Sequence, residues 1–171
     1  MNTVIKGRAH VFGKNIDTDQ IYPGRYLEYT DVTDIKKFAM AGIDEHFAQN
    51  FQAGEIIVAG TNFGCGSSRE HAAITLKGIG VGAIIAESFA RIFFRNAVNL
   101  GIPVILCKNI SSIIRDGDEI SIELEKGLIR NLTTRQTIQA IPLSPYILTI
   151  IHSGGIKPMI RKLLTEKSNQ P

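Results

Sequence analysis

The chain has 171 residues, of which 44% are hydrophobic and 20% are charged, and its formal net charge is +3. This composition is ordinary for a globular protein and shows no basic cluster with interleaved aromatic residues, so it argues against nucleic-acid binding. No apolar run approaches the roughly 20 residues of a membrane helix. With Cys65 and Cys107 as its two cysteines, the chain lacks a disulfide framework, which favours a reducing, cytoplasmic setting.

The length predicts a single domain over residues 1–171, folded over about 1–165 with a frayed tail at 166–171. In the first part of the chain, residues 3–12 alternate as a strand does. Residues 15–26 are polar and contain Pro and Gly, which predicts a loop. Two short helices are expected within 29–38 and 43–51.

Apolar strands and helical segments then alternate. Strands are predicted at 56–59, 81–86 and 102–106. A helix is predicted from about Ser68 to Lys77 and another from Glu87 to Asn99, with Phe89, Ile92, Phe93 and Ala97 on one face. This order predicts parallel pairing with right-handed crossovers.

The last third has a different character. A short helix is expected at 110–115, followed by strands at 120–124, 127–131 and 134–138 that form an antiparallel meander, and by helices at 144–154 and 157–166. The fold class is therefore α/β, with a mixed, partly parallel sheet flanked by helices and a C-terminal antiparallel meander.

The segment Gly64-Cys65-Gly66-Ser67-Ser68-Arg69-Glu70-His71 joins a buried strand to a helix start. Free backbone N–H groups at such a place favour an anion. Arg69 is unfavourable near the positive end of a helix dipole unless it meets an anion, and a carboxylate would satisfy its guanidinium. Nearby positive charge would also favour an ionised Ser67, which makes Ser67 a possible general base.

Simpler interpretations of these residues remain open. Ser67 and Glu70 have the spacing of a helix capping box. A lone His71 is more often a packed residue than an acid or base. Cys65 as a nucleophile would need a base partner that the sequence does not indicate, and Cys107 fits a core position.

The polar loop places Asp17 and Asp19 two residues apart, but the rest of a calcium-binding loop is missing. The pair forms either an Asx-rich turn or, in the case of Asp19, a hydrogen-bond acceptor that supports the glycine loop. Further on, Arg25 and Glu28 could each contact a ligand or simply be solvated.

Together, three stretches resemble the small subunits of the isopropylmalate dehydratase family, the swivelling domain of the aconitase superfamily. They are Gly64 to Ala72, Asn15-Ile16-Asp17-Thr18-Asp19-Gln20-Ile21, and Ala90-Arg91-Ile92-Phe93-Phe94-Arg95-Asn96. The resemblance runs from Gly7 to about Leu164. It implies a β/β/α swivelling fold and a hydro-lyase subunit that interconverts 2- and 3-isopropylmalate by dehydration and rehydration, for leucine biosynthesis.

The resemblance also implies roles for residues and a partner. Ser67 would be the base, Arg69 would hold a substrate carboxylate, and Ser68 and Asp19 would line the site. Arg25, which the loop itself offers as a ligand contact, would join them in binding the substrate. A separate large subunit, in a heterodimer or heterotetramer, would carry a 4Fe–4S cluster acting as Lewis acid on the leaving hydroxyl. This chain would bind no metal, since it has too few cysteines for a cluster.

Leu27, Glu28 and Tyr29 fall where this family selects among substrates. Homoaconitase-like members tend to carry an arginine there, whereas Glu28 would repel a third carboxylate, which favours an alkylmalate. A 2,3-dimethylmalate dehydratase remains an alternative, because one methylene group changes binding too little for strong discrimination. A homoaconitase is a further related hydro-lyase that stays open. A non-enzymatic dicarboxylate-binding regulatory module also remains open.

Overall fold

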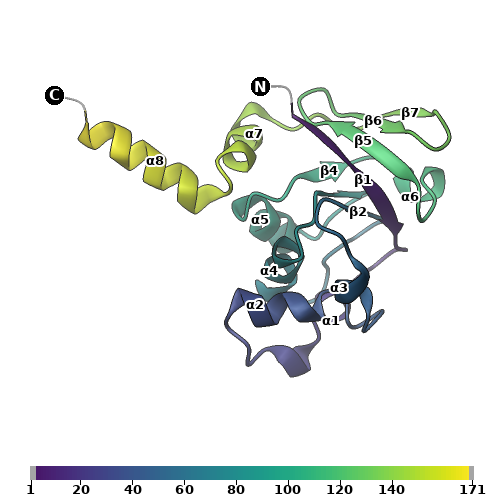
Figure 1. Ribbon diagram of the computed structural model, residues 1–171, viewed down its shortest axis with the longest axis horizontal. Helices are drawn as coiled ribbons and strands as arrows, with labels where there is room; N and C mark the ends of the chain where they lie inside the picture. Colours follow the sequence, from purple (N-terminus) through teal and green to yellow (C-terminus); the bar gives the residue numbers. More distant parts are fainter. Residues whose placement is uncertain (1–2, 170–171) are drawn as a thin grey trace.

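Seven strands form one mixed sheet through the centre of the protein (Figure 1). The computed structural model describes residues 3–169. In space the strands follow the order β4-β3-β2-β1-β5-β6-β7. Their bounds are β1 Val4–Val11, β2 Ile56–Ala59, β3 Ala83–Ala86, β4 Val104–Leu106, β5 Glu119–Glu123, β6 Leu128–Asn131 and β7 Thr137–Gln139.

The sheet has a parallel half and an antiparallel half that meet at β1. Strands β1 to β4 pair in parallel, with Ile57 opposite Ile84, and this confirms the parallel pairing predicted from the alternating pattern. On its other edge β1 pairs antiparallel with β5, with Ile5 opposite Ile122. Strands β5, β6 and β7 continue as the predicted antiparallel meander.

Helices and short 3-10 turns surround this sheet. Their bounds are α1 Thr18–Ile21, η1 Gly24–Tyr26, α2 Val32–Ile35, η2 Lys36–Phe38, α3 Phe47–Asn50, α4 His71–Gly78, α5 Arg91–Asn99, α6 Ile110–Ile113, α7 Pro145–His152 and α8 Ile156–Ser168.

Each face of the parallel half has its own apolar core. Alternate residues of a strand point to opposite faces, so Ile57 and Ile84 enter one core with Leu76 of α4 and Phe93 of α5. Their chain neighbours enter the second core, with Ile110 of α6. All residues of β2 and β3 are buried, as expected for parallel strands covered on both sides.

Two helices begin later than the sequence predicts. Helix α4 starts at His71 rather than at Ser68, and α5 starts at Arg91 rather than at Glu87. Before α5 the chain is extended, because Phe63 N–H donates to Ser88 and Ala90 N–H donates to Phe63. The predicted apolar face of that helix is therefore partly wrong. Phe89 precedes the helix and Ile92 is exposed, whereas Phe93 and Ala97 are buried.

Other corrections concern shorter segments. The helix expected at 43–51 is reduced to the single turn α3. Helix α8 extends away from the sheet (Figure 1) and continues through Ser168, so residues 166–168 are helical rather than frayed, and residues 170–171 of the predicted tail lie outside the described residues. No helix within residues 3–169 has the length and apolar character needed to cross a bilayer.

Candidate functional site

The polar segment before α1 runs beside the glycine loop that precedes α4. Gly64 N–H donates to the Ile16 carbonyl at 2.7 Å, and Thr18 N–H donates to the Cys65 carbonyl at 2.8 Å. Asp17 and Cys65 form a parallel bridge. These contacts tie the loop to the polar segment, and α4 begins only after it, at His71.

Gly64 occupies a position that no other residue fits well. Its φ is +82°, and a Cβ there would lie 2.3 Å from Cγ of Phe93, a buried residue of α5. Gly66 also has a positive φ, of +103°. Both glycines therefore provide a backbone conformation that other residues adopt at a cost, and Gly64 also allows the close approach to α5.

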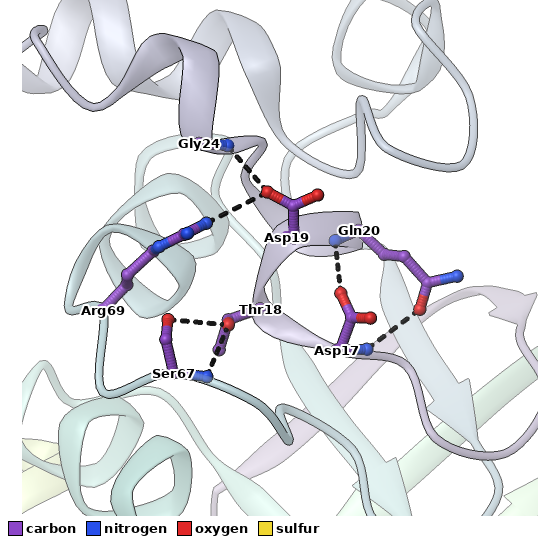
Figure 2. Close-up of polar contacts among 7 residues, drawn as sticks. All are labelled: Asp17, Thr18, Asp19, Gln20, Gly24, Ser67 and Arg69. Carbon is purple, nitrogen blue, oxygen red and sulfur yellow. Dashed lines mark hydrogen bonds and ion pairs between the residues drawn. The ribbon is translucent and has the colours of Figure 1, made fainter.

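Ser67 makes two contacts with the hydroxyl of Thr18 (Figure 2). Its N–H donates to Thr18 Oγ1 at 3.1 Å, and the two hydroxyl oxygens are 2.9 Å apart. Thr18 is 3% exposed, whereas Ser67 is exposed. Since Thr18 Oγ1 already accepts from the Ser67 amide, its own hydrogen is available for donation to Ser67 Oγ. Such a donor would stabilise an anionic serine oxygen.

Sequence reasoning did not single out Thr18 as a functional residue. The signal in the sequence was its position between Asp17 and Asp19, in a polar segment that was already a candidate for supporting the glycine loop. Only the pairing of this segment with the glycine loop brings the threonine hydroxyl to Ser67. Thr18 is thus a positioning residue for the serine.

The capping box that the spacing of Ser67 and Glu70 left open does not form. Glu70 is the N-cap of α4, without a side-chain capping bond, and Ser67 bonds Thr18 instead. A capping box forms at the start of α1, where Gln20 N–H donates to Asp17 Oδ1 at 2.8 Å and Asp17 N–H donates to Gln20 Oε1 at 2.9 Å. Because a helix dipole acts within the first turn and α4 begins only at His71, α4 supplies little positive potential at Ser67.

Arg69 is oriented by Asp19. Its Nη1 donates to Asp19 Oδ1 at 3.1 Å, and Gly24 N–H donates to the same oxygen at 2.8 Å (Figure 2). The hydrogen bond from Gly24 lowers the pKa of Asp19 most, followed by the one from Arg69, so Asp19 is ionised at neutral pH. The Arg69 side chain is 29% exposed. Within residues 3–169, Asp19 is its one side-chain partner, which leaves other N–H groups free for an anion.

The remaining predicted site residues lie along the next stretch of chain. Ser68 is exposed. Arg25 is 3.8 Å from the Glu45 carboxylate and stacks 4.6 Å from the ring centroid of Tyr26. Its charge also contributes to the lowered pKa of Asp19, after the hydrogen bonds from Gly24 and Arg69.

The predicted specificity residues differ in their surroundings. Leu27 and Glu28 are exposed. Tyr29 is half-buried, with its ring stacked 5.3 Å from that of Phe38. Arg69 and Asp19 thus contact each other directly, and Ser67 contacts Thr18, the chain neighbour of Asp19, whereas the specificity residues lie on the adjoining loop.

The two cysteines do not form a centre for metal or nucleophilic chemistry. Cys107 is 2% exposed, and burial raises the pKa of its thiol. Cys65 is half-buried in the glycine loop. In the described part of the chain, no three side chains of the metal-binding types gather at one place. Because a 4Fe–4S cluster is held by several cysteine thiolates, the residues present do not fit such a cluster.

Residues 6–109 match the aconitase C-terminal domain. The chain belongs to the aconitase family. An isopropylmalate/citramalate isomerase small subunit from Methanocaldococcus jannaschii is 49% identical over 97% of this chain and 99% of the relative. A 3-isopropylmalate dehydratase small subunit from Methanopyrus kandleri is 47% identical over 95% of each chain.

A solved structure agrees over the same length. The crystal structure of a 3-isopropylmalate dehydratase from Methanocaldococcus jannaschii has a TM-score of 0.90 and 44% sequence identity, and covers 98% of this chain and 100% of its own. This agreement confirms the predicted aconitase-type swivelling fold. A UPF0107 protein, with a TM-score of 0.51 and 20% identity, shares the fold alone.

Proposed function

We propose that this chain is the small subunit of a 3-isopropylmalate dehydratase, a hydro-lyase that interconverts 2- and 3-isopropylmalate for leucine biosynthesis. The observation that carries the proposal is that one glycine loop presents both Ser67, an exposed residue, and Arg69, whose side chain is 29% exposed. Relatives of the same length, named as small subunits of this activity, support it.

Each residue of the loop would have a definite part in the reaction. Arg69, held by Asp19, would bind a substrate carboxylate through its free N–H groups. Ser67 Oγ, ionised and stabilised by the Thr18 hydroxyl, would take the proton from the carbon next to a carboxylate. The electron pair of that C–H bond would form the double bond as the hydroxyl leaves the neighbouring carbon. Rehydration would reverse these events, with water added to the other carbon.

The site is half of a reaction centre. In this proposal the 4Fe–4S cluster belongs to a separate large subunit, because the described residues of this chain do not fit one. The exposure of Ser67, Ser68 and Asp19 leaves a surface on which that subunit can dock. The free thiols of Cys65 and Cys107 are consistent with a cytoplasmic protein.

The loop after Arg69 favours an alkyl substituent on the substrate. Glu28 is exposed beside exposed Leu27, and Arg25 already has Glu45 within reach. A third carboxylate on the substrate would therefore be repelled by Glu28, while Arg25 is already paired with Glu45. An apolar pocket rejects a smaller alkyl group only moderately, so 2,3-dimethylmalate belongs in any substrate panel.

Reconstitution tests the function directly. The isolated chain should give no turnover of 2-isopropylmalate, and addition of a cluster-loaded large subunit should restore it, as followed by chromatographic separation of the two isomers. Turnover by the isolated chain would reject the shared site. Tight binding of 3-isopropylmalate to the isolated chain in calorimetry, with no turnover by the pair, would instead favour a dicarboxylate-binding module.

Arg69→Lys should raise KM in the reconstituted enzyme by roughly 10- to 100-fold with little change in kcat, because lysine keeps the charge but loses the two parallel N–H···O bonds to a carboxylate. Initial rates over a substrate series measure both constants. Arg161→Lys, on exposed α8, is the matched control and should behave as wild type. An unchanged KM for Arg69→Lys together with a raised KM for Arg25→Lys would move the carboxylate clamp to Arg25.

A further inference from the structure

Two side chains hold the backbone of residues 26–29, here called the specificity loop, at its two ends. The Tyr22 hydroxyl donates to the Tyr26 carbonyl at 2.6 Å. At the other end, His71 Nε2 lies 3.2 Å from the Tyr29 carbonyl. A carbonyl can only accept, so the imidazole donates through an Nε2–H. Both the neutral Nε2–H tautomer and the charged imidazolium can make this bond.

The two donors are packed against each other. The rings of Tyr22 and His71 are stacked, with centroids 5.2 Å apart and an interplanar angle of 24°. Tyr22 is fully buried, and burial raises the pKa of its phenol, so that the hydroxyl stays a donor at neutral pH. Displacement of either ring would therefore disturb both carbonyl contacts.

The loop's own aromatic rings are fixed as well. The Tyr26 ring stacks on Phe38 at 3.8 Å with an interplanar angle of 11°, and the Tyr29 ring stacks on the same residue at 5.3 Å. The residues between them, Leu27 and Glu28, are exposed. The loop is therefore fixed at both ends, and the side chains of Leu27 and Glu28 are free to contact another molecule.

The anchor and the reacting groups belong to one short stretch of chain. His71 is the first residue of α4 and follows Arg69 by two positions. Gly24, just before the loop, donates to Asp19, which in turn accepts from Arg69. The segment 67–71 thus carries the proposed base, the proposed carboxylate clamp and a contact to the far end of the loop.

We propose that His71, stacked on Tyr22, is a positioning residue that fixes the specificity loop relative to Ser67 and Arg69, and that selection among alkylmalates depends on this anchor. The inference rests on the proposed function and extends it to specificity. His71 itself touches the loop carbonyl rather than the substrate. Its loss should change which alkyl group is preferred more than it changes the rate of the chemical step.

Two measurements test the anchor, each on His71→Leu, His71→Gln and Tyr22→Phe. The first is amide hydrogen exchange of the isolated full chain. Exchange at Leu27 and Tyr29 should become about tenfold faster in His71→Leu and Tyr22→Phe, because the loop opens locally. His71→Gln keeps a donor and should stay within about threefold of wild type. His46→Leu, an exposed histidine before α3, is the matched control and should leave exchange unchanged.

The second measurement is the ratio of kcat/KM for isopropyl- and methyl-substituted malates in the reconstituted enzyme. This ratio should fall by about tenfold in His71→Leu through a raised KM for the isopropyl substrate, with kcat nearly unchanged and with recovery in His71→Gln. Unchanged loop exchange in both His71→Leu and Tyr22→Phe would overturn the anchor. Faster exchange with an unchanged ratio would overturn its role in selection. Absence of turnover by the wild-type pair would count against the proposed function instead, while the exchange result would still decide the anchor.

Discussion

Ser67→Ala should lower kcat of the reconstituted enzyme by about 10³-fold or more and leave KM within a few-fold of wild type. A positioned general base contributes roughly 10²- to 10⁴-fold to a rate, and alanine cannot accept the proton. Substrate binding should survive, because Arg69 and its partner Asp19 are untouched. Single-turnover and steady-state rates of isomerisation measure the effect.

Stability and assembly separate a chemical effect from a structural one. Ser67→Ala removes the hydrogen bond to the buried Thr18 hydroxyl, so the free energy of unfolding should fall by only about 0.5–1.5 kcal/mol, and the reconstituted complex should still assemble. Ser168→Ala, near the end of exposed α8, is the matched control and should be fully active. Near-normal kcat in Ser67→Ala would remove this serine as the base.

Thr18→Val tests the same proton-transfer step through the hydrogen-bond partner of Ser67. Valine keeps the shape of threonine but removes the oxygen that bonds both the amide and the hydroxyl of Ser67. An intermediate fall in kcat is therefore consistent with a positioning role. A loss as large as that of Ser67→Ala would instead mean that the hydroxyl pair acts as one unit.

Gly64→Ala should destabilise the protein by about 2–5 kcal/mol. The φ of +82° costs about 1–2 kcal/mol for a residue with a Cβ, and the Cβ would lie 2.3 Å from Cγ of buried Phe93, which adds about 1–3 kcal/mol of overpacking. Denaturant unfolding measures the loss, and the melting temperature should fall by roughly 5–15 °C. Activity should also fall, because Ser67 is three residues away in the same loop.

Gly154→Ala isolates the two contributions. Gly154 has nearly the same φ, of +83°, but a Cβ there would meet nothing within 4 Å. The stability lost in Gly154→Ala should therefore be confined to the backbone cost of about 1–2 kcal/mol. Equal losses of stability in Gly64→Ala and Gly154→Ala would show that Phe93 moves aside at little cost. The close packing of the glycine loop on α5 would then not be what holds the loop in place.

The sheet was predictable because its signals are local. Runs such as Ile56–Ala59 and Ala83–Ala86 are buried on both faces, and a run of apolar residues between helical segments is typical of parallel strands. The short strands after residue 118 carry turn residues between them, which is sufficient to predict a meander. Helix starts were less predictable, because backbone N–H groups just before α4 and α5, such as those of Gly64 and Ala90, donate to distant segments.

Within the candidate site, the sequence determined the residue types. An exposed serine, an arginine and a supporting aspartate were identifiable because glycine-rich turns and charges near a helix start are informative by themselves. The tertiary structure alone decided their partners. Ser67 has the spacing of a capping box with Glu70, yet it bonds Thr18, which is 49 residues away in the chain. Local spacing favours contacts with near neighbours, and it carries no information on which distant segment lies alongside.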